Sequence, residues 1–157
     1  MKAIVIYYSY GGNTRRIAQA AARELGADIA EIKTVVPYAG SYDDVVDQGQ
    51  TEVNSGFCPE IEPLNARLED YDTVILGSPV WWYTFAPAMH SFLRQANLTG
   101  KTVFPFATNG GWLGHTLKDF ASACPGAQVR QGLNVRFNGD RQITPDAEIS
   151  RWIHAIH

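Results

Sequence analysis

Six consecutive residues near the amino end have the types that bind a phosphate group through neutral donors. They are Ser9, Tyr10, Gly11, Gly12, Asn13 and Thr14. The hydroxyl and amide side chains are donors, and the paired glycines let backbone N–H groups approach an oxygen closely. The lysine of a nucleotide-triphosphate loop and the spaced glycines of a dinucleotide turn are both missing. We therefore expect a single phosphate here, with Ser9 as a donor and not a nucleophile, although the segment alone also fits an ordinary turn.

A second segment, residues 79–85, is dense in aromatic residues. It places Trp81, Trp82, Tyr83 and Phe85 directly after a predicted buried strand. Some of these rings must pack into the core, as aromatic side chains usually do. The remaining rings form a flat apolar wall, which favours a planar aromatic ligand whose edge meets backbone donors and acceptors.

The third segment, residues 108–114, joins three glycines to a tryptophan. Gly110, Gly111 and Gly114 allow the backbone to touch the edge of a ring, while Trp112 can lie over its face. Together with the aromatic segment, these residues predict a site that holds a heterocycle between two walls.

The second and third segments and their flanks carry no formal charge. Residues 73–93 and 102–117 include no Asp, Glu, Lys or Arg, and only His90 and His115 titrate there near neutral pH. Both histidines are expected on helices, and we assign neither to a ligand. Without a carboxylate pair, a thiolate or a metal-ligand cluster, the segments lack groups for hydrolysis or acyl transfer. We therefore expect a cofactor to supply the reactivity, with no metal and no catalytic side chain.

An alternating set of strands and helices must position these segments. Apolar or alternating runs predict five strands, at residues 3–8, 28–32, 73–77, 102–107 and 129–137. Apolar residues at helical spacing predict helices that end at Gly26, that span 86–96 and 113–123, and that begin with Thr144 as cap and Pro145 as first residue. Residues 37–63 are rich in breakers and predict a long loop with a short helix at 42–47, followed by a short helical approach at 64–71.

Strands that alternate with helices imply right-handed crossovers that cover both faces of a parallel sheet. The expected fold is therefore α/β: a three-layer, doubly wound, five-stranded parallel sheet, in a single domain over residues 1–157. In such sheets ligands bind outside the carboxyl ends of the strands, at the switch point. The three segments follow the first, third and fourth strands, so we expect them to converge on one crevice at this edge.

Composition limits the classes of partner. The 13 Lys and Arg against 16 Asp and Glu give a net charge of −3, and no basic cluster favours nucleic acid or an anionic membrane. We find neither a signal-peptide core nor a run of transmembrane length, so we expect the protein in the cytoplasm. Cys58 and Cys124 are far apart and have no CxxC or histidine-spaced partner, which predicts two reduced thiols and no zinc site.

These motifs resemble those of a flavodoxin. The resemblance is carried by Tyr8-Ser9 with Gly12-Asn13-Thr14, by Tyr71-Asp72 leading through Gly77-Ser78-Pro79 to Trp81-Trp82, and by Thr108 with Gly110-Gly111. It runs nearly end to end and is closest to short-chain flavodoxin-like proteins with a tryptophan-rich second loop. It implies a flavodoxin-like fold with flavin mononucleotide (FMN) as the cofactor.

The resemblance also implies the residues that contact FMN. Its phosphate would be held by Ser9, Gly11, Gly12, Asn13 and Thr14, with Tyr10 or water replacing the hydroxyl that many flavodoxins have where this chain has Gly11. One side of the isoalloxazine ring would be lined by Pro79, Val80, Trp81, Trp82 and Tyr83. The other side would be lined by Thr108, Asn109, Gly110, Gly111 and Trp112.

The function that follows is electron transfer between two partner proteins, a reductase and an acceptor. Apolar loops without a cation should disfavour the anionic reduced ring, because charge in such a site is costly, and so predict a low potential. A backbone carbonyl near Trp81 or Trp82 turned toward the ring would favour one-electron steps.

Two alternatives stay open: an NAD(P)H-dependent FMN reductase of quinones or other aromatic compounds, with Tyr83, Phe85 and Trp112 in its pocket, and a flavin-free adaptor of flavodoxin fold. The oligomeric state is left open.

Overall fold

A central parallel sheet organises the protein, whose computed structural model describes Met1–His157. The long strands are β1 (Ala3–Tyr7), β2 (Asp28–Glu31), β3 (Thr73–Trp81), β5 (Thr102–Asn109) and β7 (Leu133–Asn138). They are mutually parallel and lie in the order β2-β1-β3-β5-β7. The chain order reverses between β1 and β3, which is the switch point of a doubly wound sheet.

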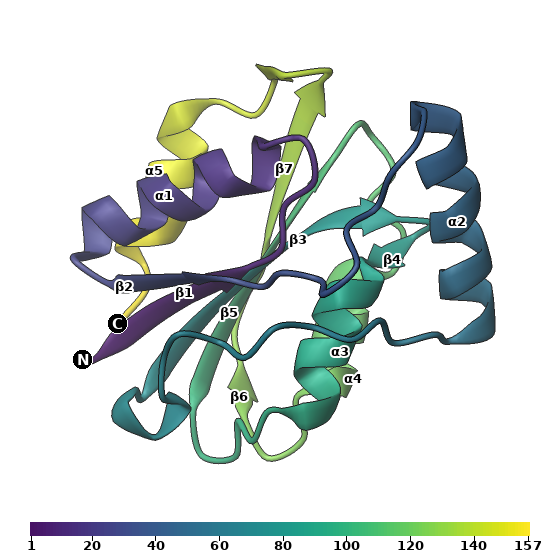
Figure 1. The fold of residues 1–157 in the computed structure, drawn as a ribbon. Coiled ribbons are helices and arrows are strands. Elements are labelled where there is room, and N and C mark those ends of the chain that lie inside the picture. Colours follow the sequence, from purple (N-terminus) through teal and green to yellow (C-terminus); the bar gives the residue numbers. More distant parts are fainter.

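Helices cover both faces of this sheet (Figure 1). They are α1 (Asn13–Leu25), α2 (Tyr42–Ser55), α3 (Pro87–Gln95), α4 (Thr116–Ala123) and α5 (Asp146–His154). Helices α1 and α5 lie on one face and α3 and α4 on the other, while α2 stands apart beyond the carboxyl end of β3 (Figure 1). The predicted α/β fold with a five-stranded parallel sheet is confirmed.

The two faces of β1 show why the layers form. Ile4 and Ile6 are fully buried in a cluster that contains Met89 of α3. Val5, which points the other way, is fully buried in a second cluster that contains Ile17 of α1. A strand that is apolar on both faces must lie inside a sheet covered on both sides, which is where β1 lies.

Three short strands extend the predicted sheet. They are β4 (Thr84–Phe85), antiparallel to β3; β6 (Gln128–Val129), parallel to β5; and β8 (Arg141–Gln142), antiparallel to β7. In addition, β3 continues to Trp81 and β5 to Asn109, past the predicted ends at residues 77 and 107. The second and third predicted loops therefore begin as strand ends.

The predicted fifth strand is broken into β6 and β7. The break contains Gly132, where an added Cβ would lie 2.7 Å from Leu117 Cδ2 and 3.0 Å from the carbonyl oxygen of Pro105. A side chain does not fit at Gly132, because the backbone passes close to β5 and α4 there. The chain then rejoins the sheet at Leu133.

The prediction for residues 37–63 was wrong in one respect, because α2 is much longer than the expected helix at 42–47. A reciprocal capping box starts it: Ser41 Oγ accepts from the Asp44 N–H (3.1 Å), and Asp44 Oδ2 accepts from the Ser41 N–H (3.1 Å). Gly49 lies inside the helix, where an added Cβ would be 3.1 Å from Trp81 Cε3. Gly49 weakens the helical pattern in the sequence, but its lack of a side chain lets the Trp81 ring pack against the helix.

Three other predicted helix boundaries also need correction. Residues 64–71 contain only one turn of 3₁₀ helix, Leu68–Asp70. Helix α4 begins at Thr116 and not at residue 113. Thr144 does not cap α5, which follows Pro145; its Oγ1 instead accepts a hydrogen bond from the Arg136 N–H (2.8 Å) and so braces β7.

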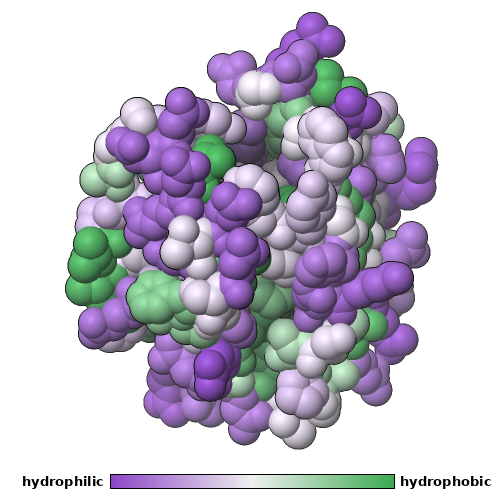
Figure 2. Space-filling model, turned by 90° about the vertical axis from the view of Figure 1, so that its right-hand side faces the viewer, coloured by the Kyte–Doolittle hydropathy of each residue, from purple (hydrophilic) through white to green (hydrophobic).

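The face that carries α2 exposes mostly hydrophilic residues, with hydrophobic patches set among them (Figure 2). Tyr42 in α2 and Phe57 just after it are among the exposed large side chains. No helix of the protein combines the length and apolar character that crossing a membrane requires.

Candidate functional site

The three predicted segments meet at the carboxyl edge of the sheet around three adjoining hollows that share Val80. The phosphate-side hollow, about 200 Å³, is lined by Tyr10, Asn13, Thr14, Pro79, Val80, Thr108, Asn109, Gly110, Phe137 and Gly139. The indole hollow, about 250 Å³, is lined by Val80, Trp82, Tyr83, Asn109, Gly110 and Trp112. The α2 hollow, about 200 Å³, is lined by Tyr10, Tyr42, Val45, Val46, Gly49, Val80, Trp81 and Trp82. Most of the predicted site residues are thereby brought together; Ser9, Gly11, Gly12 and Gly111 line none of the three.

The turn between β1 and α1 has free backbone donors. Gly11 (φ 88°) and Gly12 (φ 99°) are left-handed, and an added Cβ at either would meet no atom within 4 Å. Conformation and not crowding therefore requires glycine at both positions. Their N–H groups make no hydrogen bond inside the protein, while Ser9 Oγ accepts from the Arg15 N–H (3.2 Å). An anion at this helix start would meet these free N–H groups.

Two of the predicted donor side chains are engaged within the protein. Thr14 Oγ1 and Thr108 Oγ1 are 2.7 Å apart and both residues are buried, which ties the first segment to the third. Only one of the two hydroxyl protons is used in this bond, so one remains for a ligand. Asn13 Nδ2 donates to the carbonyl oxygen of Gly139 (2.9 Å), in the turn between β7 and β8.

A strained hairpin turn forms one wall of the indole hollow. Trp81 pairs with Thr84, and the two residues between them, Trp82 (φ 51°) and Tyr83 (φ 72°), both have positive φ, as in a type I′ turn. Neither is glycine, so surrounding contacts must hold the turn in this conformation. His115 donates its N–H to Tyr83 O (2.9 Å), and Gly114 is so close that an added Cβ would lie 2.4 Å from the same oxygen.

The two tryptophans of the second segment have different roles. The Trp81 ring packs edge-on against Tyr8, Tyr10 and Tyr38, at centroid distances of 6.0, 6.1 and 5.0 Å. Trp82 is 37% exposed and its Nε1–H donates to Val46 O in α2 (3.1 Å). The Trp81 ring therefore packs against the tyrosines and lines only the α2 hollow, whereas Trp82 lies between the α2 hollow and the indole hollow.

Replacing Trp82 with phenylalanine should loosen α2, because the substitution keeps an aromatic ring but removes the N–H that binds Val46. A single hydrogen bond contributes roughly 1 kcal/mol, so we expect amide exchange in α2 to become about fivefold faster. Trp112→Phe is the matched control, since Trp112 is 73% exposed and its indole makes no hydrogen bond. Equal exchange in the two variants would contradict the anchoring role of Trp82.

Burial dominates the ionisation behaviour of the tyrosines beneath the site. Desolvation raises the pKa of Tyr8, with a smaller contribution from Tyr10. Desolvation also raises the pKa of Tyr38, whose hydroxyl donates to Glu52 Oε1 (2.6 Å). Both hydroxyls thus stay protonated at neutral pH, and that of Tyr38 is the donor in the bond to Glu52.

Sequence reasoning missed the contribution of β7 and its turn. Phe137 and Gly139 line the phosphate-side hollow, and Arg16 lies over the Phe137 ring at 5.0 Å. Arg136 lies against the third segment, since an added Cβ at Gly111 would be 3.5 Å from its Nε atom. A cation from β7 therefore adjoins the third segment, although the segment itself carries none. The Gly139-Asp140 pair, which connects β7 and β8, was the available signal, because such pairs mark two-residue hairpins.

Helix α2 supplies the other missed residues. Tyr42, Val45, Val46 and Gly49 line the α2 hollow, in a region predicted to be mainly loop. The signal for it was the Ser41 to Asp44 spacing of the capping box. His90 and His115 line none of the three hollows, and both lie where expected: His90 is within α3, and His115 is the residue before α4, facing Asp119.

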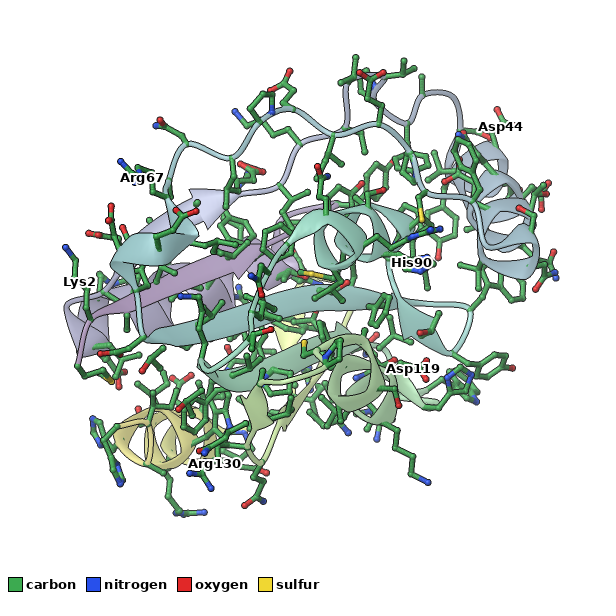
Figure 3. All side chains as sticks on the ribbon, turned by 90° about the horizontal axis from the view of Figure 1, so that it is seen from below. Lys2, Asp44, Arg67, His90, Asp119 and Arg130 are labelled. Atoms are coloured by element: carbon green, nitrogen blue, oxygen red, sulfur yellow. The ribbon has the colours of Figure 1, made fainter.

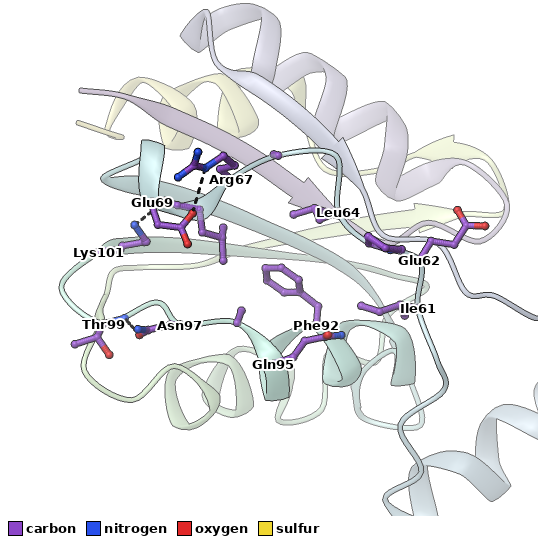
Figure 4. Close-up of a pocket in the computed structure, with 14 residues that line it drawn as sticks. Ile61, Glu62, Leu64, Arg67, Glu69, Phe92, Gln95, Asn97, Thr99 and Lys101 are labelled. Carbon is purple, nitrogen blue, oxygen red and sulfur yellow. Dashed lines mark hydrogen bonds and ion pairs between the residues drawn. The ribbon is translucent and has the colours of Figure 1, made fainter.

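A larger hollow of about 760 Å³ lies at the opposite, amino edge of the sheet (Figure 4). Its polar side chains are largely engaged with the protein. Lys101 Nζ donates to Leu68 O (2.8 Å) and Tyr71 O (2.6 Å), and Arg67 lies 3.9 Å from Glu69. None of the predicted site residues lines it, so the carboxyl edge remains the candidate site.

Comparison with known proteins places the fold and the family. A solved candidate flavoprotein from Bacteroides eggerthii is 28% identical, with a TM-score of 0.82, over 99% of this chain and 97% of that one. A flavoprotein from Lactobacillus acidophilus, solved in complex with FMN, is 25% identical, with a TM-score of 0.75, over 96% of this chain and 97% of that one. An archaeal flavodoxin, 18% identical with a TM-score of 0.60 over 98% and 92% of the two chains, shares the fold. No curated protein sequence matches significantly. The family model described as flavodoxin matches residues 2–156, and the chain therefore belongs to the flavodoxin family.

Proposed function

We propose that this protein binds FMN at the carboxyl edge of its sheet. The observation that carries the proposal is the free N–H cradle of Gly11 and Gly12, which opens beside two hollows lined by aromatic residues. The cradle lies at the β1/β3 switch point, the place at which doubly wound sheets bind ligands. The Lactobacillus acidophilus flavoprotein, similar over nearly its whole length, was solved with FMN.

The residues present fit the parts of FMN. The phosphate would be held by the turn from Ser9 to Thr14, at the amino end of α1, where free N–H groups and the helix dipole favour an anion. The ring would lie in the indole hollow between the Trp82-Tyr83 turn and Trp112. Asn109 and Gly110, which line both hollows, would contact the part between phosphate and ring.

We propose electron transfer between a reductase and an acceptor protein as the role of the bound flavin. When bound, FMN supplies electron transfer in one- or two-electron steps. The chain's own contribution is to hold the ring between the Trp82-Tyr83 turn and Trp112. No carboxylate or cysteine lines the indole or the phosphate-side hollow, so neither hollow offers a carboxyl or thiol group for substrate chemistry. We expect the protein in the cytoplasm, where its two free cysteines would remain reduced.

A binding experiment with the purified protein tests the cofactor. We expect a yellow protein, or apoprotein that quenches the fluorescence of added FMN and binds it at least about a hundredfold more tightly than riboflavin, because two or more charge-assisted hydrogen bonds to phosphate contribute roughly 3 kcal/mol. Colourless protein that ignores FMN would instead support a flavin-free adaptor. Equal affinity for FMN and riboflavin would contradict the proposed phosphate site at Gly11 and Gly12.

The α2 hollow favours one alternative, an FMN-dependent NAD(P)H reductase of quinones or other aromatic compounds. It is lined almost entirely by apolar and aromatic side chains and lies on the other side of Trp82 from the indole hollow. An aromatic substrate could bind there, with the Trp82 side chain between it and the flavin ring. Rapid oxidation of NADH or NADPH by a quinone without an added reductase would select this alternative over the electron carrier.

A further inference from the structure

A cysteine and a histidine lie in contact outside the candidate flavin site. Cys58 Sγ, in the segment after α2, is 3.4 Å from His90 Nδ1 in α3. Cys58 is partly exposed, and the Figure 3 view places His90 between α3 and the end of α2. The His90 ring packs against the ring of Phe85, at a centroid distance of 6.0 Å. The sulfur thus has a fixed imidazole beside it and remains open to solvent.

The pair lies at the edge of a hollow of about 360 Å³. His90 and Phe57, the residue before Cys58, line it together with Phe85. Two acidic side chains, Glu52 of α2 and Asp119 of α4, also line it, and no Lys or Arg does. A reagent that reaches Cys58 through this hollow therefore meets apolar walls and two carboxylates, that of Glu52, which accepts from Tyr38 and Gln48, and that of Asp119, which faces His115.

The surroundings keep the imidazole able to accept a proton. Burial lowers the pKa of His90, and the positive charge of Arg94 on the same helix lowers it further. The other groups that face it are the Cys58 thiol and, across the hollow, Glu52 and Asp119. A neutral imidazole next to a thiol can take the thiol proton as the sulfur attacks.

We propose that Cys58 is a site of reversible mixed-disulfide formation with small, positively charged disulfides, and that His90 accepts its proton. The Cys58 sulfur attacks one sulfur of the reagent, forming a new S–S bond while the S–S bond of the reagent breaks. The thiol proton moves to His90 Nδ1 and then to the departing thiolate, which leaves as a free thiol. The disulfide reagent is the oxidant, so electrons balance without a further partner.

The second cysteine is an internal contrast. Cys124 is 2% exposed, and burial raises its pKa to about 11. It should stay unmodified in the folded protein. The proposal does not depend on FMN, because Cys58 and His90 line none of the three flavin-site hollows.

Mass spectrometry of the folded protein after treatment with cystamine, a dicationic disulfide, tests the proposal. We expect a single adduct at Cys58, lost in Cys58→Ser, and at least about tenfold slower reaction with the dianionic 3,3′-dithiodipropionate, because like charges in the hollow repel it. His90→Asn should slow the cystamine reaction about tenfold at neutral pH and by a much smaller factor in alkaline solution, where hydroxide replaces the imidazole as the base. His154→Asn, on the distant α5, is the control and should react normally.

Several results would overturn the proposal. An unchanged rate in His90→Asn at neutral pH would make the pair purely structural. Modification at Cys124 would contradict Cys58 as the accessible site. Equal rates with the two disulfides would contradict the preference for a positively charged reagent. If His90→Asn does not fold, the pH profile of the unsubstituted protein decides: a rate that stays proportional to the hydroxide concentration through neutral pH, with no plateau, would exclude assistance by His90.

Discussion

Alanine at Gly77 is expected to destabilise the protein by at least about 3 kcal/mol, in the range of severe overpacking. Gly77 of β3 is the register partner of Phe106 in β5. An added Cβ at Gly77 would lie 2.1 Å from Phe106 Cζ and 2.5 Å from Cε1. The Phe106 ring is fully buried and packs against Trp152 of α5, so it has no free space to move into. The clash must displace either the ring or the central strands.

Urea unfolding of apoprotein measures this effect. Gly110→Ala is the matched control, because Gly110 does not have positive φ and the nearest atom to an added Cβ is Phe137 O at 3.9 Å. It should change the free energy of unfolding by less than about 1 kcal/mol. Phe106→Leu in the Gly77→Ala background should recover part of the loss, since the two sites are coupled through one contact. A loss below 1 kcal/mol in Gly77→Ala, or no recovery, would contradict this account of the packing.

The sheet was predictable because its signals are local and strong. Continuous apolar runs such as the one around Val5 and Ile6 form only where both faces are covered, and strand–helix alternation then fixes a parallel doubly wound sheet. The three ligand segments could also be placed, because the carboxyl ends of parallel strands share one edge. These inferences need no knowledge of particular side-chain contacts.

The parts that were missed depend on contacts between distant residues. Gly49 suggests a helix break in the sequence, but in the fold it receives the Trp81 ring, and α2 continues past it to Ser55. The turn at Trp82 and Tyr83 has no glycine, so nothing in its composition predicts a hairpin with positive φ. Arg136 comes from a strand with no motif, and only the register of β7 beside β5 brings it near Gly111.

Alanine at Gly12 is expected to weaken FMN binding by about 30- to 100-fold, a result that rests on the proposed cofactor. Gly12 has φ 99°, which L side chains rarely adopt, so the turn must change its conformation to accept a Cβ. The change moves the free N–H groups away from the phosphate, and each charge-assisted hydrogen bond that is lost costs roughly 1.5–3 kcal/mol. Riboflavin has no phosphate, so its affinity should change little.

Gly26→Ala is the matched control at the other end of the same helix. Gly26 is also left-handed (φ 62°), and an added Cβ there would likewise meet no atom within 4 Å. Both substitutions introduce a Cβ at a left-handed position, but only Gly12 belongs to the cradle. Fluorescence titration of each variant with FMN and with riboflavin therefore separates the two effects: Gly26→Ala should lower stability and leave both affinities unchanged. If Gly12→Ala weakened FMN and riboflavin equally, the phosphate would have to bind elsewhere.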